Sequence, residues 1–160
     1  MVKFDMDIKE IESKVKLLDD IEQIKQLQIR YVNCLITSNF DEIMDCFAKD
    51  IVTDIGPHGV VKGWEEVEKL FKERVSRGHQ GHEGDFLIHP LISVDGDRAK
   101  GSWLLYLMKQ FPHKIAGGLD MDWEQGFYEA EYVREDGKWK ISYLKFKVKL
   151  SSPRPPYPKD

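Results

Sequence analysis

The segment RGHQGHEGDFLIHP gathers most of the side chains in this chain that could perform acid–base chemistry. His82 lies there among glycines, and an imidazole with its ordinary pKa is mostly neutral at pH 7, so it could act as a general base. Asp85 could hold that imidazole in one tautomer, or could itself be the base if burial raises its pKa. The alternative is that His82 is an exposed loop residue and Asp85 a solvated acid at the start of a strand.

The same segment also offers metal ligands, because His79-x-x-His82-Glu83-x-Asp85 places nitrogen and oxygen atoms in a short span. A glycine-rich loop, however, gives the two imidazoles no helix or strand that would aim both at one ion. The chain also shows no phosphate-binding loop, no Rossmann glycine pattern, no nucleophile elbow and no zinc-finger spacing. We therefore expect no metal and no cofactor.

Tyr31 is the candidate proton donor. It lies on the apolar stripe of a predicted helix, where a tyrosine is usually a core residue whose hydroxyl is satisfied by a neighbour. With an ordinary pKa of about 10 it keeps its proton at pH 7 and could instead donate to a substrate oxygen. General acid–base catalysis needs such a donor and a base. The candidate acid–base set is therefore Tyr31, His82 and Asp85.

Apolar residues at helical spacing predict the elements that position Tyr31. One narrow stripe is typical of an amphipathic leader helix within residues 1–19. The stripe consists of Ile8, Ile11, Val15 and Leu18. A break near Asp19 would separate the leader from a main helix that Asp20 caps and that ends near residue 35. Two shorter helices are predicted, over residues 41–48 and 64–77.

Turn signals divide the remainder into strands with no helix between the last four, a pattern typical of an antiparallel meander. The predicted strands cover residues 51–55, 60–62, 86–94, 99–111, 123–134 and 139–150. The alternation of apolar residues slips between Tyr143 and Leu144, which predicts a bulge that bends the sheet. Residues 103–108 are apolar on both faces, so one face should meet the helices and the other a second subunit.

Length and composition set the remaining limits. The 160 residues suit one α+β domain at residues 20–150, preceded by the leader and followed by an extended tail at 151–160 that holds four of the seven prolines. A net charge of -4 argues against nonspecific nucleic-acid binding. No apolar run approaches the roughly 20 residues of a membrane helix. Two cysteines suit a reducing compartment. We expect a cytoplasmic protein with neither nucleic acid nor membrane as partner.

The order of these elements resembles the SnoaL-like branch of the nuclear-transport-factor-2-like superfamily. The matching stretches are DIEQIKQLQIRYVNCL, DIVTDIG…GVVKGWEEVEKLF, ISVDGDRAKGSW and GFYEAEYVREDGKWKI. The resemblance implies an α+β cone in which N-terminal helices pack on a strongly bent antiparallel sheet and enclose a deep, mostly apolar pocket. It also implies a homo-oligomer, with a trimer preferred over a dimer.

Within that branch the chain is most similar to cofactor-free dehydratases of the scytalone-dehydratase and bile-acid-7α-dehydratase type. Residue by residue, Tyr31 matches their helix tyrosine, and the family histidine falls on Asp85, or on His82 after a short shift. Two acidic residues of the family pattern are replaced here by Ile36 and Leu107. That departure removes acid–base partners on which the family relies.

The resemblance also implies three substrate-binding residues. Asp54 lies near a polar position of related pockets, although it could equally be a turn residue before Gly56 and Pro57. Trp103 matches a pocket-lining residue and Tyr128 is turned inward, although both could be ordinary core. Together with Tyr31 these aromatic residues would line one pocket, suited to a ring-shaped, largely apolar ligand.

The prediction for function is a cofactor-independent lyase, a dehydratase that acts by acid–base chemistry on a cyclic hydrophobic small molecule. One alternative is a non-catalytic small-molecule-binding protein of the same fold, favoured by the missing acids at Ile36 and Leu107. The other is an isomerase or cyclase, which needs only one base and one donor for the developing oxyanion.

Overall fold

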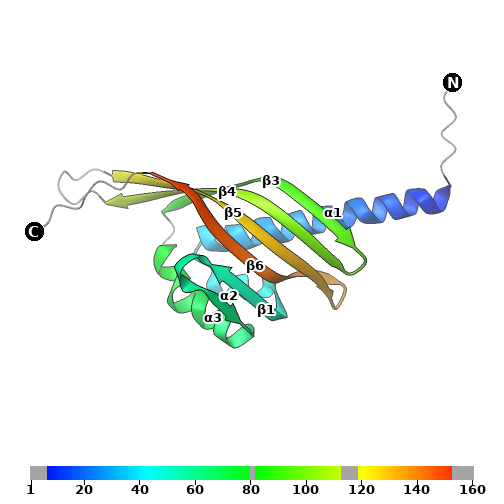
Figure 1. Ribbon diagram of the computed structural model, residues 1–160, viewed down its shortest axis with the longest axis horizontal. Coiled ribbons are helices and arrows are strands. Elements are labelled where there is room, and N and C mark those ends of the chain that lie inside the picture. The colour runs from blue at the N-terminus through cyan, green and yellow to red at the C-terminus, as the bar shows by residue number, and fades with distance from the viewer. Residues whose placement is uncertain (1–6, 80–81, 113–118, 153–160) are drawn as a thin grey trace, which may run out of the picture.

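Three helices and one six-stranded sheet make up the computed structural model, which describes residues 7–79, 82–112 and 119–152 (Figure 1). The helices are α1 (Ile8–Ile36), α2 (Phe40–Ile43) and α3 (Trp64–Glu73), with 3-10 turns at Met44–Cys46, Gly56–His58 and Val75–Gly78. The strands are β1 (Phe47–Ile55), β2 (Val60–Lys62), β3 (Glu83–Asp95), β4 (Arg98–Pro112), β5 (Leu119–Glu135) and β6 (Lys138–Ser151). The α+β class is confirmed. Within the described ranges, every helix is too short or too polar to cross a membrane.

The sheet has the order β2-β1-β6-β5-β4-β3. Strands β3 to β6 form the predicted antiparallel meander, and β1 and β2 form the predicted hairpin. The prediction of a wholly antiparallel sheet is wrong, because β1 runs parallel to β6 and places Val52 opposite Tyr143. The segment through α3 carries the chain from β2 to the far edge at β3, so β1 meets the sheet only at β6. A pairing between strands so distant in sequence leaves no local signal.

The sheet is long and twisted rather than strongly curled (Figure 1), so the predicted cone does not form. Bulges are present: Ser142 is the extra residue in β6 opposite the step from Glu131 to Tyr132, next to the slip read from the sequence. A second bulge in β6 falls opposite Gln125 and Gly126, and β3 has its own between Ile88 and Leu91. Each adds local twist. They lie at different heights in the sheet, so they do not combine into one sharp bend.

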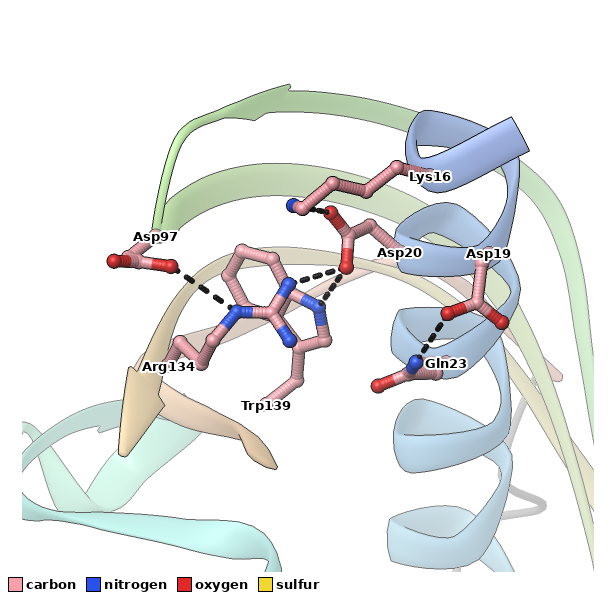
Figure 2. A network of polar contacts seen from close by, with 7 residues as sticks. All are labelled: Lys16, Asp19, Asp20, Gln23, Asp97, Arg134 and Trp139. Carbon is pink, nitrogen blue, oxygen red and sulfur yellow. Dashed lines mark hydrogen bonds and ion pairs between the residues drawn. The ribbon is translucent and has the colours of Figure 1, made fainter. Parts of the chain in front are cut away.

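Helix α1 runs without interruption from Ile8 to Ile36, so the predicted break near Asp19 is wrong. Asp20 does not cap a second helix, because it lies on the buried side of α1 with 3% of its surface exposed. Its carboxylate accepts hydrogen bonds from Trp139 Nε1 at 3.2 Å, from Lys16 at 2.9 Å and from Arg134 (Figure 2). A buried charge inside a helix is tolerated here because three donors from both sides of the core surround it.

Figure 2 shows how this network fastens α1 to the sheet. Arg134, near the end of β5, also donates to Asp97 in the β3–β4 turn at 3.1 Å and lies over the Trp139 ring at 4.5 Å. Burial alone would raise the pKa of Asp20, but the hydrogen bonds from Lys16, Arg134 and Trp139 lower it below its ordinary value. The anchored part of α1 then passes over the buried face of the sheet and places Tyr31 there.

Two apolar surfaces stay exposed on the described part of the chain. The N-terminal end of α1 projects beyond the sheet (Figure 1). Val15 and Leu18 are 59% and 66% exposed. Val15 and Ile24 are nine residues apart, which at about 100° per residue puts the stripe on the side opposite the core. The second surface is the outer face of β4 and β5. It contains Tyr106, Met108, Trp123 and Phe127.

The outer-face residues alternate with side chains buried under α1, so the prediction that residues 103–108 are apolar on both faces is confirmed. Trp103, Leu105 and Leu107 are buried, whereas Tyr106 and Met108 are more than a third exposed. Self-association through these surfaces stays a prediction.

Candidate functional site

The carboxyl group of Asp85 is the most unusual polar group in the described structure. Asp85 is the third residue of β3 and lies opposite Leu107 of β4, on the face of the sheet that the helices cover. Both of its carboxyl oxygens are buried, and neither has a hydrogen-bond partner among the described residues. Burial, and then the nearby charge of Glu83, raise its pKa from 3.8 to about 7, while Lys109 opposes the shift. Such a group can exchange a proton near neutral pH.

Two buried tyrosines lie within electrostatic reach of Asp85. Tyr31 of α1 and Tyr128 of β5 meet edge to face, with ring centroids 5.9 Å apart and planes at 86°. Their hydroxyls share a hydrogen bond, and burial raises the pKa of both, with the charge of Asp85 adding to the effect. Both hydroxyls therefore stay protonated at neutral pH and are donors. A buried donor pair beside a buried carboxyl is an arrangement that can stabilise a developing oxyanion while a base works nearby.

A histidine and a second carboxylate complete the group. His79 Nδ1 lies 2.6 Å from Glu83 Oε1, and the two side chains are 15% and 2% exposed. One ligand atom from each of His79, Glu83 and Asp85 can be chosen so that all three lie within 4.8 Å of one another. We call these three residues the acid–base cluster. Glu83 and Asp85 share a face because they are two residues apart on a strand, and the 3-10 turn at Val75–Gly78 delivers His79 to them.

Three donor atoms this close could also bind a divalent cation. The imidazole of His79, however, already has Glu83 as a partner, and the fourth ligand considered from the sequence, His82, is exposed and does not join the cluster within the described ranges. The arrangement therefore fits proton transfer better than a preformed metal site.

The structure places the sequence-predicted catalytic residues in different surroundings. Tyr31 and Asp85 are brought together on the buried face. His82 lies just before β3, exposed, and its backbone oxygen accepts a hydrogen bond from the Gln110 amide at 2.9 Å. The histidine beside the carboxylates is His79 instead. The signal that could have found it is the four-residue spacing between His79 and Glu83 together with the shared face of Glu83 and Asp85.

The predicted substrate-binding residues are also separated. Tyr128 belongs to the tyrosine pair described above. Trp103 Nε1 donates a hydrogen bond to the Tyr132 hydroxyl at 2.9 Å, and that hydroxyl donates to Gln28 Oε1 at 2.9 Å. Trp103 is therefore the first donor in a buried chain of hydrogen bonds. Asp54 forms an ion pair with Lys145 at 3.3 Å on the face of the sheet away from the helices. It is not brought to the acid–base cluster.

Within the described ranges, Tyr31, Trp103 and Tyr128 line no common pocket. Aromatic rings fill the space: Tyr31 contacts Phe47 and Phe71 at centroid distances of 5.8 Å and 6.2 Å, and Phe146 packs on Tyr128 at 4.8 Å. A hollow of about 500 Å³ lies instead on the outer face of the sheet, lined by Leu91, Ser102, Glu129 and Tyr143 among others. The straighter sheet explains the difference, because a sheet that does not curl leaves no space beneath it.

Comparison with known proteins gives the same fold. The SnoaL-like domain family matches residues 16–145. A candidate scytalone dehydratase from Novosphingobium aromaticivorans superposes with a TM-score of 0.71 at 17% identity, covering 84% of this chain and 87% of that one. The hexachlorocyclohexane dehydrochlorinase LinA-type3 from Novosphingobium barchaimii superposes with a TM-score of 0.72 at 18% identity, covering 88% and 94%. An NTF2-like protein with a cystatin-like fold from Novosphingobium aromaticivorans gives 0.71 at 16% identity, covering 91% and 92%. These identities are low enough that the structures establish the fold alone, and the family match establishes that this chain belongs to the SnoaL-like domain family, with the NTF2-like fold.

Proposed function

We propose that the protein is a cofactor-independent lyase that removes a proton from carbon next to the carbonyl group of a cyclic, largely apolar small molecule, with Asp85 as the base. The observation that carries this proposal is the Asp85 carboxyl, buried and without a hydrogen-bond partner among the described residues, with a pKa of about 7. A carboxylate that water does not stabilise is a stronger base than an exposed one, and it is still ionised in about half of the molecules at pH 7.

Tyr31 and Tyr128 have the complementary role in this proposal. Proton removal beside a carbonyl leaves negative charge on the carbonyl oxygen, and that charge needs a hydrogen-bond donor. Two buried hydroxyls that stay protonated meet the need, and they contact each other, so together they can respond to one substrate oxygen. The names of the dehydratase and the dehydrochlorinase reported above both describe eliminations, the loss of water and of hydrogen chloride, which supports the reaction class.

The groups around Asp85 must open before a substrate can reach it, because its carboxyl oxygens are closed off from solvent in the described conformation. The proposal therefore requires an opened state. Closure over the bound molecule would keep water away from the base and preserve its raised pKa.

The first chemical step can be tested without knowing the natural substrate. Cyclohexanone and 1-indanone are incubated with the protein in D₂O, and loss of the α-proton signal is followed by NMR. Asp85→Asn should slow the exchange by about 10²- to 10⁴-fold, and Tyr31→Phe by about 10²- to 10³-fold. Asp95→Asn, an exposed aspartate on the same strand, is the matched control and should exchange at the parent rate. Exchange that is unaffected by Asp85→Asn would remove Asp85 as the base.

The second candidate function is non-catalytic binding of a small molecule. The apolar residues Ile36 and Leu107, at positions where the resemblance expects acids, favour it, as does the filled interior. A binder would take up a cyclic ketone, seen as a shift in thermal melting, yet would leave the exchange rate equal to that in buffer.

A further inference from the structure

We propose that the exposed apolar stripe on the N-terminal part of α1 is a coiled-coil seam, and that it packs in parallel against the same stripe of α1 in a second copy of this chain. The seam lies apart from the acid–base cluster, so this inference is independent of the proposed function. It goes beyond self-association in general, because it names the segment that pairs, its occupant and the direction of the pairing.

The spacing of the stripe is that of two heptads. Its four residues follow one another by three, four and three positions, which is the a, d, a, d order of a coiled coil. They are Ile8, Ile11, Val15 and Leu18, with exposed fractions between 42% and 71%. A stripe restricted to a and d positions is the narrow seam of a coiled coil, whereas a helix that packs on its own core carries a wider apolar face.

The core side of α1 fixes the direction in which the seam points. Asp20 takes the f position of the second heptad, opposite the seam, and Arg134 and Trp139 hold it in the core. The seam therefore faces away from the sheet, and the N-terminal end of α1 also projects beyond the sheet (Figure 1). A second copy can approach α1 from this side without displacing any packed element.

The length of the seam is limited by charge. Glu22 and Lys25 take the next a and d positions and form an exposed ion pair at 3.7 Å, so the apolar seam ends at Leu18. Two heptads are short for helices that must fold as they associate, because an isolated helix of that length is marginal in water. Here α1 is already held by its buried side, and association does not have to order it.

The charges beside the seam favour the parallel direction. Asp19 takes the e position and Lys14 the g position, and in a parallel pair each g residue faces the e residue of the next heptad in the other helix. Lys14 would thus face Asp19 of the second copy, with opposite charge. One heptad earlier Asp7 would face Glu12, but Asp7 lies at the start of α1, where backbone N–H groups stabilise negative charge.

The antiparallel direction is disfavoured by the same residues. With Ile11 against Val15, an antiparallel pair would bring Lys14 to Lys14 and Glu12 to Glu12 of the second copy, which are like charges. The present partner of Lys14 is Glu10 at 2.7 Å, and both side chains are about half exposed. Such a surface pair contributes little to stability, so Lys14 can exchange it for Asp19 of the second copy.

A parallel seam has one axis along the helices and suits two or three copies. Isoleucine at both a and d, as in Ile8 and Ile11, is typical of more than two strands, whereas Val15 at a with Leu18 at d is typical of two. The direction of pairing is therefore compatible with the trimer that the resemblance implies.

Disulfide cross-linking tests the direction. Val15→Cys places a thiol at an a position, where only a parallel pair in register brings identical residues within reach of a disulfide. After mild oxidation at micromolar concentration, non-reducing gels should show most of this variant as two linked chains. Ser13→Cys, at an exposed f position, is the matched control and should stay unlinked. Cys34 and Cys46 are buried, so the parent should stay unlinked as well.

Charge reversal is the second measurement. Lys14→Glu should raise the dissociation constant for self-association, measured by sedimentation equilibrium, by about two- to tenfold. Adding Asp19→Lys to that variant should return the constant to within about twofold of the parent, because the pair is restored with its signs exchanged. A dissociation constant that Lys14→Glu leaves unchanged would contradict the proposed pairing.

Four further results would overturn the inference. One is a parent that is monomeric at micromolar concentration, and another is equal linkage of Val15→Cys and Ser13→Cys. Faster linkage between Ile11→Cys and Val15→Cys, mixed as separate proteins, would show an antiparallel pair. Linkage of Val15→Cys to Met108→Cys would place the stripe on the outer sheet face of the second copy instead.

Discussion

The raised pKa of Asp85 predicts that folding stability falls as the pH rises, and that the substitution Asp85→Asn removes this dependence. Asp85 has an ordinary pKa of 3.8 and a folded pKa of about 7. Between these values the unfolded chain has already lost the proton that the folded chain retains, so each increase in pH favours unfolding. Below about pH 4 the group is protonated in both states, and above about pH 7 it is ionised in both, so the loss is confined to that window.

The magnitude follows from the two pKa values. The full difference of about three pH units corresponds to about 4 kcal/mol at about 1.4 kcal/mol per unit, and the part that falls between pH 5 and pH 8 is about 2.6 kcal/mol. Asp85 is only partly shielded from solvent as a residue, so we expect about 2 kcal/mol in practice. Glu83, His79 and Lys109 also surround the group, but they are present in both proteins and largely cancel in a comparison.

The assay is urea unfolding of the parent and of Asp85→Asn at pH 5 and at pH 8. Going from pH 5 to pH 8, the free energy of unfolding of the parent should fall by about 2 kcal/mol more than that of the variant. With a typical urea dependence this is a shift in midpoint of about 1 M. Asn is close in shape to a protonated Asp, so the difference between the two pH values, rather than either absolute stability, is the quantity to compare. Equal changes in the two proteins would show that the Asp85 carboxyl is not desolvated.

Three further predictions concern other parts of the structure. Asp20→Asn should lower the free energy of unfolding by about 3 to 5 kcal/mol, because Arg134 loses its buried counter-charge. Asp19→Asn, whose partner Gln23 is exposed, should lower it by less than about 1 kcal/mol. Urea unfolding of both variants checks this, and equal losses would contradict it. Gly126→Ala should lower the free energy of unfolding by about 1 to 3 kcal/mol, since its new Cβ would lie 2.4 Å from the Phe146 ring. The Cβ of Gly84→Ala would meet its nearest atom at 4.0 Å, so this control should have nearly the parent stability. Thermal melting of both variants checks the difference. Light scattering should give a multiple of 18.7 kDa, with a trimer preferred, and Val15→Glu combined with Leu18→Glu should reduce that mass; a parent that is monomeric at micromolar concentration would refute the prediction.

Local patterns predicted most of the fold, and tertiary contacts decided the rest. The meander and the β1–β2 hairpin follow from alternation and turn residues, which act over a few positions. Asp20 was misread because its sequence context resembles that of a helix cap. Its partners Arg134 and Trp139 lie more than a hundred residues away and leave no local sign that it is a buried helix residue. The parallel pairing of β1 with β6 has the same origin, since neither strand carries a local sign of its partner.

The candidate site could also be predicted only in part from the sequence. Tyr31 and Asp85 were found from residue type together with the resemblance to the SnoaL-like branch, and the structure brings them to one buried face. His79 was missed in favour of His82 because both lie in a glycine-rich segment, where neither helical nor strand periodicity fixes which side chain turns inward. The filled interior could not be foreseen either, because the curvature of a sheet depends on where its bulges fall relative to one another.

The interior position of β6 in the sheet has a consequence for how the chain acquires its structure during synthesis. β1 and β2 are made early, yet they join the sheet only through β6, which is made after the other five strands. Until then the hairpin and α3 have no sheet edge to close against, and their apolar residues stay exposed. Contacts of such long range form slowly, and exposed apolar surface is where chaperones act and where aggregation begins. The hairpin and α3 are therefore the vulnerable part of the nascent chain, and their protection arrives in one late step when β6 pairs with β1 and β5.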